Sequence, residues 1–305
     1  MDQKGILGVV LGLVTAFFIG LFMVPRRYAR SDNVTFLLGM MAGAAVGSAA
    51  YWLVAGAPWQ WSWAVFFSLV PGVNWAVGSY AYAFGTERIG LAKATGIKNT
   101  QVVVTTVGGF VFFHERASTE PVSAVIGAAL VVATAVYLSW IEHREESLPS
   151  ASPAGYLVPI IASILYGVNG VFMKLLIVWN VPRPLANLGI GLGALLGGVA
   201  LYVLTGRRFC DLPKAGLKNH FLALAGGVTW ALGLVTMILS IDYAGLAVGW
   251  SLMNLSVVVS VLYGVVVLRE IDLRRRWGRV AIGLVLACLG IAALYLSKLL
   301  PAVAG

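Results

Sequence analysis

The chain alternates long apolar runs with short polar segments. Ten runs reach about 20 residues, and at 1.5 Å per helical residue each is long enough to cross the roughly 30 Å apolar core of a bilayer. They cover approximately residues 5–25, 35–55, 63–85, 91–113, 121–140, 156–178, 185–204, 219–241, 245–268 and 278–299. The pattern predicts an all-α integral membrane protein with ten transmembrane helices.

One stretch of this pattern occurs twice. The segment from Gly72 to Glu115 aligns without a gap to the segment from Gly227 to Glu270, and about one position in three is identical. The identities fall on small, aromatic and amide residues, among them the pairs Trp75/Trp230 and Asn99/Asn254. A weaker match relates Gly20–Met23 to Gly170–Met173. We therefore expect two related halves.

The halves meet at a charged, then serine- and proline-rich segment, residues 141–154. We expect a first five-helix repeat over residues 1–140, a cytoplasmic linker over 141–154 and a second five-helix repeat over 155–305. Because five is odd, the two repeats must cross the membrane in opposite directions. This is the inverted-repeat architecture of secondary transporters.

Basic residues orient the chain. Arginine and lysine favour one side of the predicted helices by about three to one, and short cytoplasmic loops carry such an excess. We expect both termini outside the cytoplasmic membrane and the linker inside. The first apolar run has no small-residue cleavage site before Pro25, so we expect a retained helix rather than a signal peptide.

The composition agrees with a membrane protein: 60% of residues are hydrophobic and only 11% are charged. The net charge of +9 arises from loop residues, with no basic stripe that would bind nucleic acid. The three histidines show no metal-ligand spacing, and no nucleophile–base set or phosphate loop is present. We expect no enzyme activity, no cofactor and no metal, and we expect Cys210 and Cys288 to be unpaired.

The segments IGLAKATGIKNTQ and GLAVGWSLMN, which enter the fourth and ninth helices, and the ending FFHE of the fourth helix carry a family resemblance. With the arrangement of five plus five helices, they resemble the drug/metabolite transporter (DMT, EamA-like) superfamily. Within it, the chain is similar to the sugar-uptake branch of glucose/ribose porters and rhamnose–proton symporters. The resemblance implies a central cavity used for alternating access.

Polar residues inside the apolar runs are the candidate substrate-binding groups. A charged lysine at a helix centre costs about 2.5–3.5 kcal/mol on the insertion scale, and Lys98 is expected near the membrane midplane. Lys98 and Gln101 share a polar stripe with Thr95 and Thr105. The stripe predicts the lining of a water-filled cavity. The alternatives are that Lys98 and Gln101 bond neighbouring helices, or that the helix starts later and the Lys98 side chain extends to the membrane interface.

Amides and aromatic rings complete the candidate set. Asn74, Asn169 and Asn254 lie deep in apolar sequence, where an amide must find hydrogen-bond partners in substrate or protein. Rings can stack on the C–H face of a sugar, and the candidates are Trp230, Trp250 and Tyr166. Paired tryptophans are also good packing residues, so a structural role stays open for them.

Carboxylates are absent from the predicted midplane. Glu87 and Asp242 fall at turns, and Glu115 and Glu270 end helices beside Arg116 and Arg269, with which we expect them to pair at the membrane interface. A proton relay of the usual carboxylate kind is therefore not visible. A coupling proton or sodium ion, facilitated diffusion and exchange all stay open.

The sequence thus predicts a secondary transporter for a small polar metabolite, most simply a sugar, in contact with membrane lipids. The first alternative is an exporter of amino acids or of amphipathic, drug-like metabolites. The second is a membrane receptor that binds without transporting, although inverted duplication offers such a receptor no obvious advantage.

Overall fold

The computed structural model describes residues 3–89, 94, 97–115, 119–142, 153–267 and 273–300, and within these ranges the regular structure is helical throughout. The helices of the first half are α1 (Gln3–Leu21), α2 (Val24–Tyr28), α3 (Asn33–Ala55), α4 (Trp63–Phe67), α5 (Leu69–Ile89), α7 (Gln101–Phe112) and α8 (Pro121–Glu142). Those of the second are α9 (Pro153–Val178), α10 (Arg183–Leu204), the 3₁₀ helix η2 (Phe209–Ala215), α11 (Leu217–Ala244), α12 (Leu246–Met253), α13 (Ser256–Val266) and α14 (Leu273–Leu299).

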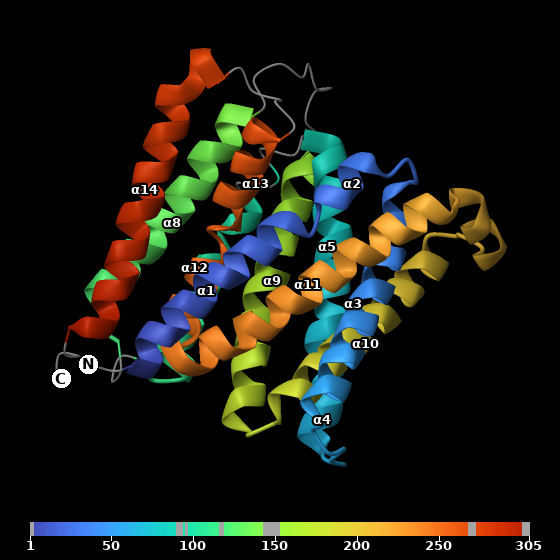
Figure 1. The fold of residues 1–305 in the computed structure, drawn as a ribbon, viewed down its shortest axis with the longest axis horizontal. Helices are drawn as coiled ribbons and strands as arrows, with labels where there is room; N and C mark the ends of the chain where they lie inside the picture. The colour runs from blue at the N-terminus through green and yellow to red at the C-terminus, as the bar shows by residue number, and fades with distance from the viewer. Residues whose placement is uncertain are drawn as a thin grey trace.

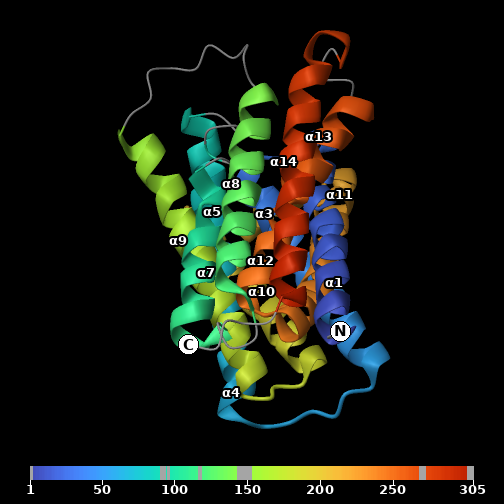
Figure 2. The same ribbon diagram turned by 90° about the vertical axis from the view of Figure 1, so that its left-hand side faces the viewer.

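The helices form one bundle with two distinct ends (Figures 1 and 2). We call the end at which α1 begins and α14 finishes the terminal end; α4, the α9–α10 turn and the α11–α12 turn also lie there. The opposite end, the basic end, carries α2 with Arg26 and Arg27 and the segment around η2 with Arg207 and Arg208. Arg26, Arg27, Arg207 and Arg208 thus lie at the end that the sequence assigns to the cytoplasm, whereas Arg183, which begins α10, lies at the terminal end.

Eight helices are long and apolar enough to cross a membrane among the described residues. Their outer faces expose large aliphatic and aromatic side chains, such as Leu7, Val10 and Phe17 of α1, as expected of surfaces that contact lipid. Eight of the ten predicted spans are therefore present as candidate membrane helices. The fourth and ninth spans take a different form.

These two spans are interrupted, whereas continuous helices over 91–113 and 245–268 are the sequence prediction. Residues 97–99 are helical, Thr100 forms a turn and α7 follows; likewise α12 ends at Met253, and Asn254 and Leu255 form a turn before α13. At both breaks a backbone hydrogen bond joins residues three positions apart, instead of the four that are usual in an α-helix. Val103 N donates to Thr100 O at 2.9 Å, and Val258 N donates to Leu255 O at 2.9 Å. The breaks fall at aligned positions of the duplicated segment.

Glycine allows four long helices to pack with their backbones in contact. A side chain at Gly227 of α11 would meet the backbone of Met40 in α3, and one at Gly72 of α5 would meet that of Ile190 in α10. The second layer repeats the pattern: a Cβ at Gly47 would lie 2.8 Å from the Cβ of Ala231, and one at Gly197 2.7 Å from that of Ala76. Helices α3 and α11 therefore meet through the same contacts as α10 and α5.

Candidate functional site

The site begins at the two helix breaks, which bring an amide from each half together. Gln101 Nε2, at the start of α7, donates to Asn254 Oδ1 at 2.7 Å, and Asn254 Nδ2 donates to Trp250 O at 2.9 Å. Both side chains are 2% exposed. In so dry a setting this bond satisfies two groups that would otherwise be costly to bury.

Lys98 lies one helical turn before Gln101 and faces two tyrosine rings. Its Nζ is 5.4 Å from the ring centroid of Tyr82 in α5 and 5.8 Å from that of Tyr166 in α9. The hydroxyl of Tyr166 is 2.9 Å from the hydroxyl of Ser79. Within the described ranges no carboxylate pairs with Lys98. The ammonium is thus held by ring faces, whose attraction is weaker than that of a counter-ion.

Two further buried groups close to this region have no hydrogen-bond partner in the described structure. They are Asn169 Oδ1 in α9 and Trp250 Nε1 in α12. The helices that carry them are in contact, because a Cβ at Gly170 would lie 2.9 Å from Cε3 of Trp250. A buried acceptor and a buried donor without partners are rare in native proteins, and an incoming polar ligand is one explanation for them.

The remaining predicted residues have protein partners. Asn74 Nδ2 donates to Leu165 O of α9 at 2.6 Å. Trp230 stacks on its repeat mate Trp75, with ring centroids 4.0 Å apart and both rings buried. The two tryptophans come from α11 and α5, so the stack lies where the two halves meet. These contacts are structural, and contact with substrate stays a prediction for both Asn74 and Trp230.

The structure therefore brings the predicted residues together in two groups. Lys98 meets Tyr166, and Gln101 meets Asn254 beside Trp250, while Asn74 and Asn169 lie on the helices α5 and α9 that flank them. Tyr82 and Ser79 were missing from the predicted site. The spacing Asn74, Gly78, Tyr82 places these three on one face of α5 and could have indicated Tyr82.

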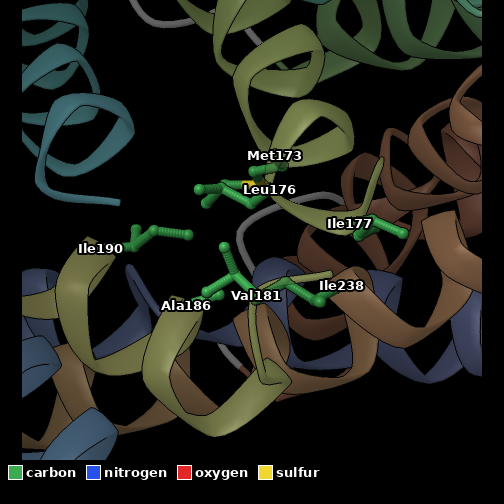
Figure 3. Close-up of a pocket in the computed structure, with 7 residues that line it drawn as sticks. All are labelled: Met173, Leu176, Ile177, Val181, Ala186, Ile190 and Ile238. Atoms are coloured by element: carbon green, nitrogen blue, oxygen red, sulfur yellow. The ribbon is translucent and has the colours of Figure 1, made fainter. Parts of the chain in front are cut away.

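A separate apolar crevice lies between α9, α10 and α11 near the terminal end (Figure 3), and it has no interior space that would hold a water molecule. Every residue that lines it is apolar: Met173, Leu176, Ile177, Val181, Ala186, Ile190 and Ile238. It offers no hydrogen-bonding side chain to a sugar. Among the described residues no group of three histidine, cysteine, aspartate or glutamate side chains could hold a metal ion.

The bond between Gln101 and Asn254 can be tested for its contribution to stability. We expect Gln101→Leu and Asn254→Leu each to lower the free energy of unfolding by about 1–3 kcal/mol, because each leaves a buried amide without its partner. The double variant should lose clearly less than the sum. Thermal unfolding of the four proteins in one detergent measures the coupling, and strictly additive losses would contradict it.

Comparison with known proteins identifies the class. The family model described as "Sugar transport protein" matches residues 10–297. The glucose uptake protein GlcU of Bacillus subtilis is 26% identical over 222 residues, which cover 72% of this chain and 74% of that protein. The "Probable glucose uptake protein GlcU" of Priestia megaterium is 25% identical over 245 residues, 75% of this chain and 78% of that one.

A solved crystal structure also shares the fold. It superposes with a TM-score of 0.75 at 16% sequence identity, and the match covers 95% of this chain and 98% of the other. The apolar helices and the family match together make this a multi-pass protein of the plasma membrane. The resemblance to the sugar-uptake branch is thereby confirmed, and this chain belongs to the sugar transport protein family.

Proposed function

We propose that this protein moves a sugar across the cytoplasmic membrane by alternating access, with residues 1–140 and 155–305 acting as two inverted five-helix halves joined by the linker 141–154. The ten crossings would be the eight long helices and the two interrupted ones. The termini would face outward and the basic end inward, as the arginines favour. Glucose uptake by the relatives supports a sugar as substrate.

The recurring glycine contacts support the inverted arrangement. The contact of α3 with α11 has the same pattern as the contact of α10 with α5, so α3 corresponds to α10 and α11 to α5. This correspondence is expected when a two-fold axis in the membrane plane relates the halves. The stack of Trp75 on Trp230, two aligned residues, lies where such an axis would pass. Each half would then contribute one broken helix to the centre of the membrane.

The observation that carries the proposal is the polar cluster at these two breaks. Broken helices near the midplane form the substrate sites of many secondary transporters, because unpaired backbone and polar side chains are available there. Lys98 and Asn169 would bond sugar hydroxyls, with Gln101 and Asn254 completing the polar wall. Tyr166 and Trp250 would supply the apolar faces against which a sugar ring packs.

Uptake and counterflow of a labelled sugar panel in proteoliposomes test the function. We expect counterflow of at least one neutral sugar, and accumulation against its gradient only if a proton or sodium gradient drives the transport. Counterflow without a gradient effect would identify a facilitator or exchanger. Silence across the sugar panel, with flux of an amino acid or amphipathic compound, would overturn the sugar assignment and favour export of such metabolites.

A further inference from the structure

A buried carboxylate joins three helices at the terminal end. Glu115, which follows α7, is 5% exposed and accepts hydrogen bonds from Leu246 N at 2.6 Å and from Ala247 N at 3.0 Å. These amides are the first two of α12, where the helix dipole favours a negative charge. Lys174 Nζ of α9 lies 3.0 Å from Glu115 Oε1. The carboxylate therefore holds the start of α12 against α7 and α9.

Two glycines lie directly against the Glu115 carboxylate, where a larger residue would crowd it. Gly245 precedes α12 with φ +87°, and a Cβ there would lie 2.9 Å from Glu115 Oε1. A Cβ at Gly109 would lie 2.7 Å from Oε2. The expected pairing of Glu115 with Arg116 at the membrane interface stays a prediction. Arg116 lies outside the described residues, and the described partners come from the second half of the chain.

The same three helices carry the candidate site. Gln101 begins α7, Asn169 lies on α9, and α12 carries Trp250 and ends directly before Asn254. Between Glu115 and these residues α7 and α9 are in close contact, since a Cβ at Gly108 would lie 2.8 Å from Cγ2 of Val171. A path from the site to the terminal end along these helices would therefore pass this contact and then Glu115.

We infer that Glu115 and Lys174 form a gate that closes the terminal end of the substrate path. In the closed state the carboxylate bonds α12 and Lys174, and for the path to open, α12 must leave Glu115. Charged groups suit this task because water solvates both of them once they part, which offsets the lost contact. The inference rests on the proposed function, since a gate presupposes a path that opens.

Cysteine labelling tests the gate without knowledge of the sugar. The two native cysteines are exposed and unpaired and can be replaced in a Cys210→Ser/Cys288→Ser background. A reporter is introduced as Val171→Cys, beneath the gate, and a membrane-impermeant thiosulfonate is applied. Trp59→Cys, an exposed position near the terminal end, identifies which membrane face that end occupies. We expect slow labelling of the Val171 reporter from that face.

Loss of the gate should expose the reporter. We expect Glu115→Gln and Lys174→Met each to speed labelling from the terminal face by about tenfold or more, since each removes a charge-assisted contact. Lys174→Arg, which keeps the positive charge, should label as slowly as the protein with the native lysine. Because Lys174→Met retains both helix-capping bonds of Glu115, it serves as the test if Glu115→Gln does not fold. Both are compared by gel filtration before labelling.

Glu120 provides a matched control. It accepts hydrogen bonds from Val122 N at 2.9 Å and from Ser123 N at 2.7 Å, and so caps the start of its own helix, α8, at the same end of the bundle. Glu120→Gln should leave labelling unchanged. Unchanged labelling in both gate variants, or an equal rise in Glu120→Gln, would overturn the gate. Absence of sugar flux with faster labelling in the gate variants would overturn the proposed substrate and leave the gate standing.

Discussion

Replacing Lys98 by methionine should reduce sugar transport by about 10- to 100-fold, the range expected when a hydrogen bond from a charged group is lost. Methionine keeps the length and the apolar stem of lysine, so packing against Tyr82 and Tyr166 is retained while the ammonium is removed. Counterflow in proteoliposomes with matched protein content measures the effect. If the variant loses substrate affinity but keeps its maximal transport rate, Lys98 contributes to binding of the sugar and not to the conformational change.

The Lys98→Met result is interpreted with a control variant and with a measurement of stability. Lys218→Met alters an exposed lysine at the start of α11, at the basic end, and should leave transport unchanged. Removing a charge from the membrane interior should also leave insertion and thermal stability intact or improved, because the insertion cost of the lysine disappears. Full transport by a folded Lys98→Met protein would remove Lys98 from the substrate path.

The sequence predicts the long membrane helices well and the local helix breaks poorly, because the two depend on different physical properties. Eight long apolar helices were found because a membrane span needs about 20 apolar residues, and hydropathy measures that requirement directly. The interruptions at Thr100 and at Asn254 were not found. Neither turn contains proline or glycine, and the polar residues beside Thr100, Asn99 and Gln101, are equally compatible with a continuous helix that lines a cavity. A local break of this kind depends on tertiary contacts, such as the bond between Gln101 and Asn254.

The site shows the same division. Lys98, Gln101 and Asn254 were predicted because polar groups in apolar sequence are conspicuous, and the structure places the latter two in direct contact. The pairing of Glu115 with Lys174 and α12 was not predicted. Both charges lie near predicted helix ends, where the ordinary reading is an interfacial anchor. Only the three-dimensional arrangement brings Glu115 to Leu246, 131 residues further along the chain.

The largest structural effect is expected at the glycines where backbones touch. We expect Gly72→Val and Gly227→Val each to abolish the folded protein, because the new side chain would overlap the backbone of Ile190 or Met40 and force two helices apart. Overpacking costs typically about 1–3 kcal/mol when neighbours can shift, and helix backbones cannot shift locally. Yield of monodisperse protein after detergent extraction measures the loss.

The control for this effect is Gly278→Val in α14, where a Cβ would meet nothing within 4 Å among the described neighbours. It should be neutral or slightly stabilising, since glycine within a helix costs up to about 1 kcal/mol relative to better helix formers. If the halves are related by the proposed two-fold axis, the variants at Gly72 and Gly227 should fail to similar degrees. A normal yield from one of them would show that its half tolerates separation of the helices, and the equivalence of the two contacts would then be wrong.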